Sequence, residues 1–202
     1  PQDAEKNTTA SLVRGMAFRM AQDGRTPAGF DLAMTSTIPV GGGLSSSAAV
    51  EAALGRAMEA LWEGRSYDAL EMARMSQFAE NVYFGKPCGL MDQASVCLGG
   101  LAFIDFAVPE DPVARRLEFD FEDHGYALCL VDVGSSHADL TDAYAAMPQE
   151  MQAVAAVFGK KRLCEVDQDD FDAHVPELRR DLGDRAVLRA IHYWRENELV
   201  DK

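Results

Sequence analysis

The sequence predicts an α+β fold, in which helical and strand-like segments are segregated along the chain rather than strictly alternating. Three observations favour this class. Apolar residues recur at helical spacing in several segments, they alternate with period two in another, and one short run near the middle is almost wholly apolar. No internal repeat is visible, and the length suits one large domain or two small ones.

The first part of the chain is expected to hold a strand between two helices. Apolar side chains lie on one side of a helix over residues 8–20, and residues 30–38 (FDLAMTSTI) alternate as a strand does. Pro39 ends that strand. A glycine- and serine-rich loop follows, and a helix begins near Ser46, because apolar residues then recur with the period of a helix.

A further helix is expected to begin after Ser66, as its N-cap, and to end at about Tyr83. Residues 94–97 and 101–106 are predicted to be two strands of a hairpin around a pair of glycines. Residues 105–123 are charged and contain two prolines, so we expect them to connect two lobes.

The remaining segment is expected to combine one buried strand with helices. Residues 126–133 (YALCLVDV) are strongly apolar, which is typical of a buried strand. Residues 140–158 and 184–199 have helical composition. Pro148 is expected to kink or divide the first of these helices, because proline lacks the amide hydrogen that a helix interior needs.

The charge and the cysteines narrow the classes of partner and compartment. The formal net charge is −14, with Lys+Arg 19 against Asp+Glu 33. Such a surface repels nucleic-acid phosphates and anionic lipids, so we expect neither a nucleic acid nor a membrane as partner. The four cysteines form no CxxC pair and no zinc-like spacing, and no signal-peptide pattern opens the chain. A reducing cytoplasm with free thiols is the expected setting.

The glycine- and serine-rich loop has the chemistry of an anion-binding site. Its glycines let the backbone approach a bulky anion, and the helix behind it contributes unpaired N–H groups and the positive end of its dipole. Serine hydroxyls add donors, and one can ligate a metal ion. We therefore predict that a phosphate group binds at Gly41, Gly42, Gly43, Leu44, Ser45, Ser46, Ser47 and Ala48.

Two better-known phosphate loops fit this segment poorly. A Walker loop ends in a lysine followed by serine or threonine, and no lysine lies here. A dinucleotide-binding fingerprint would place a third glycine at Ser46 and an acidic residue after a following strand. A plain turn with a serine N-cap is the simpler structural alternative.

A second motif, PCGLMDQ at residues 87–93, follows the loop. Together the two motifs resemble the galactokinase branch of the GHMP small-molecule kinases, whose ATP loop reads PxGxGLSSSA and whose hallmark is PCGxMDQ. Residues 128–144 are similar to a further segment of that branch. The resemblance implies a GHMP kinase fold, with an N-terminal, ATP-binding lobe over residues 1–120 and the start of a C-terminal lobe over residues 121–202.

The resemblance also implies an activity, the ATP-dependent transfer of the γ-phosphate to the anomeric hydroxyl of galactose. It implies that Asp92 is the catalytic base or orients the sugar, and that Ser47 and Glu80 bind Mg²⁺. Gly89 and Asp92 would contact galactose together with Tyr144. A sugar would be the small-molecule partner, ATP and Mg²⁺ the cofactors, and a monomer the expected state. These parts suit phosphoryl transfer, which needs positioning and charge neutralisation.

Each of these residues also has a structural explanation. Asp92 would cap a turn, Glu80 would be a solvated helix carboxylate, and Tyr144 would pack against its neighbours. His137 lies beside two serines in an expected loop, where a surface or hydrogen-bonded structural histidine is the simpler interpretation.

The family pattern is not complete in this sequence. An N-terminal sugar-binding motif and a C-terminal glycine-rich motif are missing, so we expect Pro1 and Lys202 to lie inside a longer enzyme and the isolated chain to be inactive. An arginine-rich run that many galactokinases have after the position of Tyr144 is also absent, which leaves kinases for N-acetylgalactosamine or arabinose as alternatives. A non-catalytic sugar sensor is another alternative, although the intact Ser45–Ala48 segment favours an enzyme.

Overall fold

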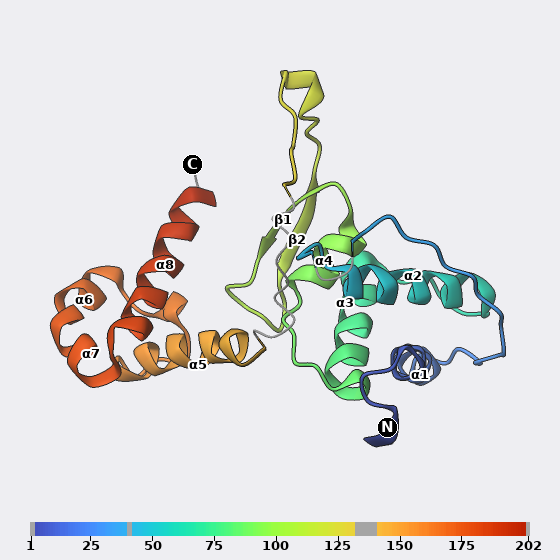
Figure 1. Ribbon diagram of the computed structural model, residues 1–202, viewed down its shortest axis with the longest axis horizontal. Helices are drawn as coiled ribbons and strands as arrows, with labels where there is room; N and C mark the ends of the chain where they lie inside the picture. Colours follow the sequence, from blue (N-terminus) through green and yellow to red (C-terminus); the bar gives the residue numbers. More distant parts are fainter. Residues whose placement is uncertain (1–2, 40–41, 132–140, 201–202) are drawn as a thin grey trace. The chain divides into compact units, whose positions relative to one another are not determined.

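The computed structural model describes residues 3–39, 42–131 and 141–200 (Figure 1). The chain divides into two compact units, residues 1–137 and 138–202, each with a hydrophobic core of its own. Helices dominate both units, and the described residues include one two-stranded antiparallel sheet, which lies in the first unit. The α+β class predicted from the sequence is therefore confirmed.

The helices of the first unit pack around a core that is rich in methionine. Met16, Met58 and Met72 are fully buried there, and their unbranched side chains fill the irregular space between helices. The packing is tight at Gly55, where an added Cβ would lie 2.3 Å from the sulfur of Met72. The elements are η1 (Asp3–Glu5), α1 (Thr9–Gln22), α2 (Ser46–Leu61), α3 (Ala69–Phe78), the π-helix η2 (Ala79–Phe84), α4 (Met91–Leu98) and η3 (Glu122–His124).

Two of the expected helices begin where the sequence indicates. The side chain of Thr8 accepts a hydrogen bond from the amide of Ser11 and caps α1, and α2 begins at Ser46. The third begins later than predicted. Its N-cap is Asp68 rather than Ser66, because Asp68 and Glu71 each accept a hydrogen bond from the other's backbone N–H.

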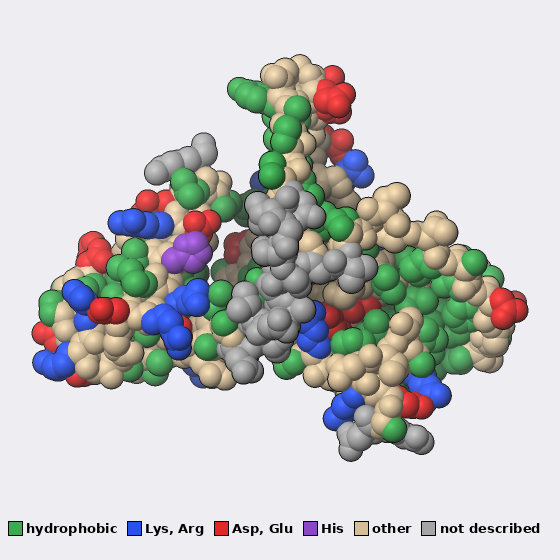
Figure 2. Space-filling model, in the orientation of Figure 1, with side chains coloured by type: hydrophobic (Ala, Val, Ile, Leu, Met, Phe, Trp, Pro, Cys, Tyr) green, Lys and Arg blue, Asp and Glu red, His purple; other side chains and the backbone are tan. Residues whose placement is uncertain are grey.

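The strand predicted at residues 30–38 does not form within the described part of the chain. These residues have no ladder hydrogen bonds, because no described segment runs alongside them as a partner. The ring of Phe30 instead packs edge-on against that of Trp62, with 6.0 Å between centroids. A cavity of about 530 Å³ lies beside the segment, and Figure 2 shows hydrophobic side chains gathered over α2.

The predicted hairpin forms from different residues. Residues 94–97 belong to α4, which ends at Gly99, and Gly100 follows with a positive φ that turns the chain into β1 (Leu101–Asp105). The partner of β1 is β2 (Val113–Leu117), in antiparallel register. The segment 105–123, which we expected to connect two lobes, thus contains a strand.

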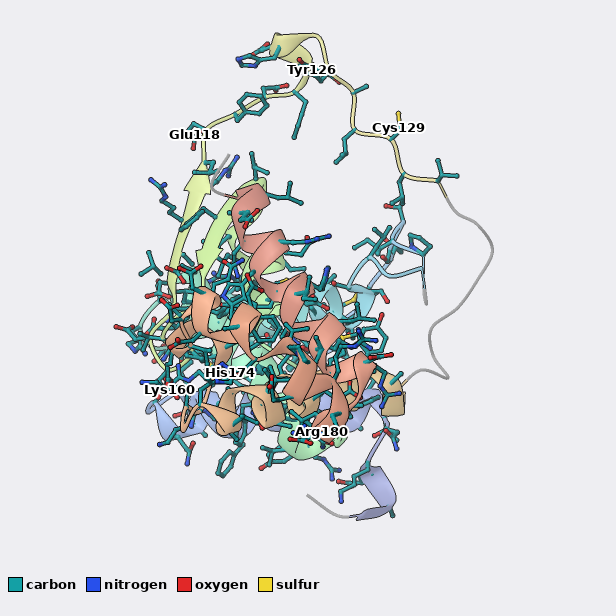
Figure 3. All side chains as sticks on the ribbon, turned by 90° about the vertical axis from the view of Figure 1, so that its left-hand side faces the viewer. Glu118, Tyr126, Cys129, Lys160, His174 and Arg180 are labelled. Carbon is teal, nitrogen blue, oxygen red and sulfur yellow. The ribbon has the colours of Figure 1, made fainter. Side chains whose placement is uncertain are left out.

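The prediction of a buried strand at residues 126–133 is also wrong for the residues of this range that the structure describes. Residues 126–131 are unpaired and exposed, with Leu128 85% exposed, and the last two positions lie outside the described residues. Figures 1 and 3 show this segment projecting beyond the helices of the first unit, with Tyr126 and Cys129 labelled on it in Figure 3. An apolar run becomes a buried strand only where neighbouring layers cover it.

The second unit is a small helical bundle. Glu150 ties two of its helices together by accepting hydrogen bonds from Arg185 and Arg189. Helix α5 passes through Pro148 without a break, so the proline does not divide it. The elements are α5 (Thr141–Val157), η5 (Leu163–Glu165), α6 (Gln168–Ala173), α7 (Val175–Leu182) and α8 (Asp184–Val200). None of the helices in the described ranges of the chain is long and apolar enough to cross a membrane.

Candidate active site

The glycine- and serine-rich loop leads directly into the N-terminus of α2. Gly41 lies outside the described residues, and Gly42, Gly43 and Leu44 are exposed. Gly43 has φ 72° and Ser45 has φ 53°, both in the left-handed region. For serine this conformation is unfavourable and is retained only where the surroundings enforce it, often in a ligand-binding loop.

The first turn of α2 has N–H groups without a partner inside the helix, next to this loop. The first intrahelical bond joins the amide of Ala49 to the carbonyl of Ser45 at 3.0 Å, so the N–H groups of Ser46, Ser47 and Ala48 precede it. Ala48 is fully buried, whereas the two serines are half-buried. No acidic residue lies in this turn to compete for the donors. The arrangement can bind an anion at the positive end of the helix dipole.

One turn farther along α2, a buried network of side chains connects this helix to the second motif. The Nε2 of Gln93 donates to Glu80 Oε2 at 2.7 Å and to Glu51 Oε2 at 3.3 Å. All three residues are at most 2% exposed. Gln93 belongs to α4, Glu80 to η2 and Glu51 to α2, so one amide joins three elements of the unit.

The burial of this network changes the ionisation of its members. Burial, followed by the negative charge of Glu80, raises the pKa of Glu51 from 4.5 to about 8. Glu51 is therefore mostly neutral at pH 7, which reduces the repulsion between two neighbouring carboxyl groups. Burial and Glu80 also raise the pKa of Cys88 to about 12, so its thiol is not a nucleophile near neutral pH.

The π-helix and the loop after it fold the second motif back over Glu80. The carbonyl of Glu80 accepts hydrogen bonds from the amides of Gly85 at 2.9 Å and Lys86 at 3.1 Å, and Gly85 turns the chain at φ 89°. The Asn81 side chain then accepts from the Cys88 amide at 2.7 Å and donates to the Cys88 carbonyl at 3.3 Å. These hydrogen bonds hold the beginning of the PCGLMDQ segment against η2.

The structure brings some of the predicted residues together. Ser47 precedes Glu51 by one turn and so shares a face of α2 with it, and Glu51 is linked to Glu80 through Gln93. Asp92 is exposed in the first turn of α4, where a carboxylate is favoured by the helix dipole.

The sugar-contacting residues of the prediction lie in two places. Gly89 is exposed, with open space where a side chain would be, and borders a cavity of about 470 Å³ that Arg74, Gln77 and Glu110 also line. Tyr144 lies in α5 of the second unit and is 53% exposed, so its part in sugar binding stays a prediction. His137 lies outside the described residues.

The donor set around Glu80 fits a hard divalent cation. Two buried oxygens of the network, Glu51 Oε1 and Gln93 Oε1, have no hydrogen-bond partner among the described residues. A serine hydroxyl, carboxylates and amide oxygens are ligands that Mg²⁺ accepts beside its waters. Among the described residues there is no cluster of three or more His, Cys, Asp and Glu side chains placed to hold a metal, so waters and phosphate oxygens would complete the shell.

Sequence reasoning missed the roles of Glu51, Gln93 and Lys86 in this network. Glu51 left a visible signal, because it is an acidic residue on the apolar face of α2, between the buried Ala48 and Leu54. An isolated carboxylate on such a face indicates a buried polar contact elsewhere in the fold. Gln93 left no such signal beyond its place in the PCGLMDQ motif, and Lys86 left none.

The chain is similar in sequence to known proteins. Residues 11–100 match the family described as the GHMP kinases N terminal domain, a range that includes the loop and the whole network. The chain is 34% identical to a galactokinase of Streptomyces coelicolor over 98% of its own length and 50% of that protein. It is 31% identical to a galactokinase of Actinobacillus pleuropneumoniae serotype 5b, over 99% of this chain and 51% of the relative.

A galactokinase of Bacillus subtilis is 28% identical over 91% of the chain and 47% of the relative. The chain thus spans about half the length of the curated relatives it matches. The phosphate-type loop, the left-handed Ser45 and the buried network all fall inside the matched range. The predicted resemblance to the GHMP kinases is confirmed, because residues 11–100 of this chain match the GHMP kinase N-terminal domain.

Proposed function

We propose that this chain supplies the nucleotide- and metal-binding part of an ATP-dependent galactokinase. The observation that carries the proposal is the Gln93 amide, which joins the PCGLMDQ motif to the helix that begins at the glycine-serine loop. Two motifs that are separate in sequence are therefore parts of one site. The matched galactokinases support the choice of sugar kinase.

Each part of the site has a distinct task in this proposal. The N–H groups of Ser46, Ser47 and Ala48 bind nucleotide phosphates at the start of α2. Ser47 and Glu80 hold Mg²⁺, which neutralises charge on the phosphates when it is bound. Asp92, exposed in the first turn of α4, accepts the proton of the attacking sugar hydroxyl or orients that hydroxyl. Gly89 leaves its backbone accessible for a sugar hydroxyl.

Nucleotide binding is tested on the chain itself. A fluorescent ATP analogue should bind the wild-type chain, and Gly43→Ala should weaken binding, because alanine resists the φ of 72° that the loop needs. Gly159→Ala is the matched control, since Gly159 has φ 68° and lies in the second unit with open space around it. Equal binding by wild type and Gly43→Ala would argue against the loop as the phosphate site.

The sugar is tested by turnover in a longer protein that contains this chain. Galactose, N-acetylgalactosamine and arabinose are offered with ATP, and galactose should be phosphorylated most efficiently. Asp92→Ala should reduce kcat by about 100-fold or more if the carboxylate acts on the attacking hydroxyl. Full activity of Asp92→Ala would remove that role, and tight sugar binding without turnover would favour the non-catalytic sensor.

A further inference from the structure

Lys86 contacts the one oxygen of Glu80 that Gln93 does not hold. Its Nζ lies 3.2 Å from Glu80 Oε1, whereas Oε2 accepts the Gln93 amide at 2.7 Å. The side chain of Glu80 is 3% exposed and that of Lys86 is 51% exposed. The two oxygens are therefore unequal: Oε2 is bonded within the protein and Oε1 pairs with a cation that reaches it from solvent.

The backbone places Lys86 at this position while leaving its side chain free to move. The bond from the Lys86 amide to the Glu80 carbonyl and the left-handed Gly85 fix the start of the side chain beside η2. The ammonium group sits on a flexible four-carbon stem and can leave Oε1 without any change in the backbone. Glu80 cannot follow it, because Gln93 holds the carboxylate in place.

A lysine and a divalent ion at one carboxylate oxygen compete with each other. Both bind to Oε1, and each is repelled by the positive charge of the other in this buried place. Lys86 already supplies a positive charge to the pair of buried carboxyl groups, since its charge also acts on Glu51. A metal ion that binds Glu80 must therefore displace Lys86 from an existing ion pair. At an exposed carboxylate it would displace only water.

We propose that Lys86 is a built-in competitor of the divalent cation at Glu80, which lowers the metal affinity of this site and leaves Oε1 when the metal binds. The inference rests on the proposed function, because that function assigns Mg²⁺ to Ser47 and Glu80. In this arrangement Gln93 is a positioning residue that keeps Oε1 directed outward for either cation. A weakened metal site favours a metal that arrives already bound to nucleotide phosphates.

The test measures Mn²⁺ binding to the whole 202-residue chain without nucleotide, by the paramagnetic resonance signal of free Mn²⁺ and by calorimetry. Lys86→Met keeps most of the aliphatic stem and removes the charge, and it should bind Mn²⁺ about tenfold more tightly than wild type, or about 1.4 kcal/mol. Lys86→Arg should stay near wild type. Mn²⁺ should also raise the melting temperature of Lys86→Met more than that of wild type.

A matched control separates the local contact from the overall charge. Lys160→Met removes one positive charge from an exposed residue of the second unit, labelled in Figure 3, and should leave Mn²⁺ affinity unchanged. Equal or weaker Mn²⁺ binding by Lys86→Met, or an equal gain in Lys160→Met, would overturn the proposal. Circular dichroism of each variant confirms that the comparison is between folded chains.

Failure of the proposed function would look different. Glu80→Gln should abolish Mn²⁺ binding at this site, and if it does while Lys86→Met changes nothing, the metal site stands and the competition by Lys86 is refuted. If Glu80→Gln leaves Mn²⁺ affinity unchanged, the ion binds elsewhere, and both the metal role of Glu80 and the inference fail. Absence of Mn²⁺ binding in every variant also refutes both.

Discussion

Replacement of Glu51 by glutamine should make the chain more stable, and the gain should grow with pH. The unfolded chain releases the Glu51 proton near the ordinary pKa of 4.5, whereas the folded chain keeps it until about pH 8. Between these values the folded state binds more protons than the unfolded state, so the free energy of unfolding falls as pH rises. Glutamine has no proton to lose and avoids this penalty.

The size of the effect follows from the displacement of the pKa. A change from 4.5 to about 8 corresponds to roughly 5 kcal/mol if the environment is rigid. One titrating group changes stability by at most about 1.4 kcal/mol per pH unit, and relaxation around a buried charge reduces this, so we expect the advantage of Glu51→Gln over wild type to grow by about 2–3 kcal/mol between pH 5 and pH 8. The Oε1 of glutamine can still accept from Gln93, so the main contact is kept.

Urea unfolding followed by circular dichroism at several pH values, with a chelator present, measures this difference. Glu63→Gln is the control, because Glu63 is exposed, and its curve should run parallel to that of wild type. If the curves of Glu51→Gln and wild type are parallel from pH 5 to pH 8, Glu51 does not hold its proton in the folded chain, and the ionisation of the network has been misjudged.

Three further effects can be measured on the same chain. Arg25→Met should lower the free energy of unfolding by about 2–4 kcal/mol, because the buried guanidinium donates to three backbone carbonyls, those of Glu59, Trp62 and Arg65. Gly55→Ala should cost about 1–3 kcal/mol, because its Cβ would overlap the Met72 sulfur. Iodoacetamide at pH 8 should modify Cys88 at least about tenfold more slowly than the exposed Cys129.

Each of these has a comparison that isolates its cause. Arg74→Met removes an exposed arginine of the same unit and should change stability by less than about 0.5 kcal/mol. Gly29→Ala adds a methyl group where nothing lies within 4 Å and should be equally mild. A similar loss of stability in either control would contradict the reason given for the corresponding variant. Alkylation of Cys88 as fast as that of Cys129, measured by mass spectrometry, would contradict the raised pKa of Cys88.

Local signals predicted the helices and the loop, because their causes lie within a few residues of sequence. Helical periodicity predicted α1 and α2, and the run of glycine and serine predicted the loop that precedes α2. The strands could not be predicted in the same way, because strand formation depends on a partner segment. Residues 30–38 and 126–131 have strand-like sequences and no described partner, while β2, a charged segment, has one in β1.

The chemistry of the site was predictable only in part for a related reason. Ser47 and Glu80 were identified through a family resemblance, and nothing in their local sequence shows that one amide, that of Gln93, would join their helices. The raised pKa of Glu51 depends on burial by three elements, and burial is a property of the tertiary fold.

The π-helix η2 sets a limit on how the length of this segment can vary. In a π-helix each N–H group bonds to the carbonyl five residues earlier, one residue more than in an α-helix. Loss of one residue would therefore favour ordinary α-helical hydrogen bonds. Deletion of one residue between Glu80 and Gly85 would shorten this turn and displace the Gly85 and Lys86 amides that bond to the Glu80 carbonyl. Lys86 would then no longer be held beside Glu80. Single-residue insertions and deletions, harmless in most surface connections, should therefore be among the most damaging changes at this point of the chain.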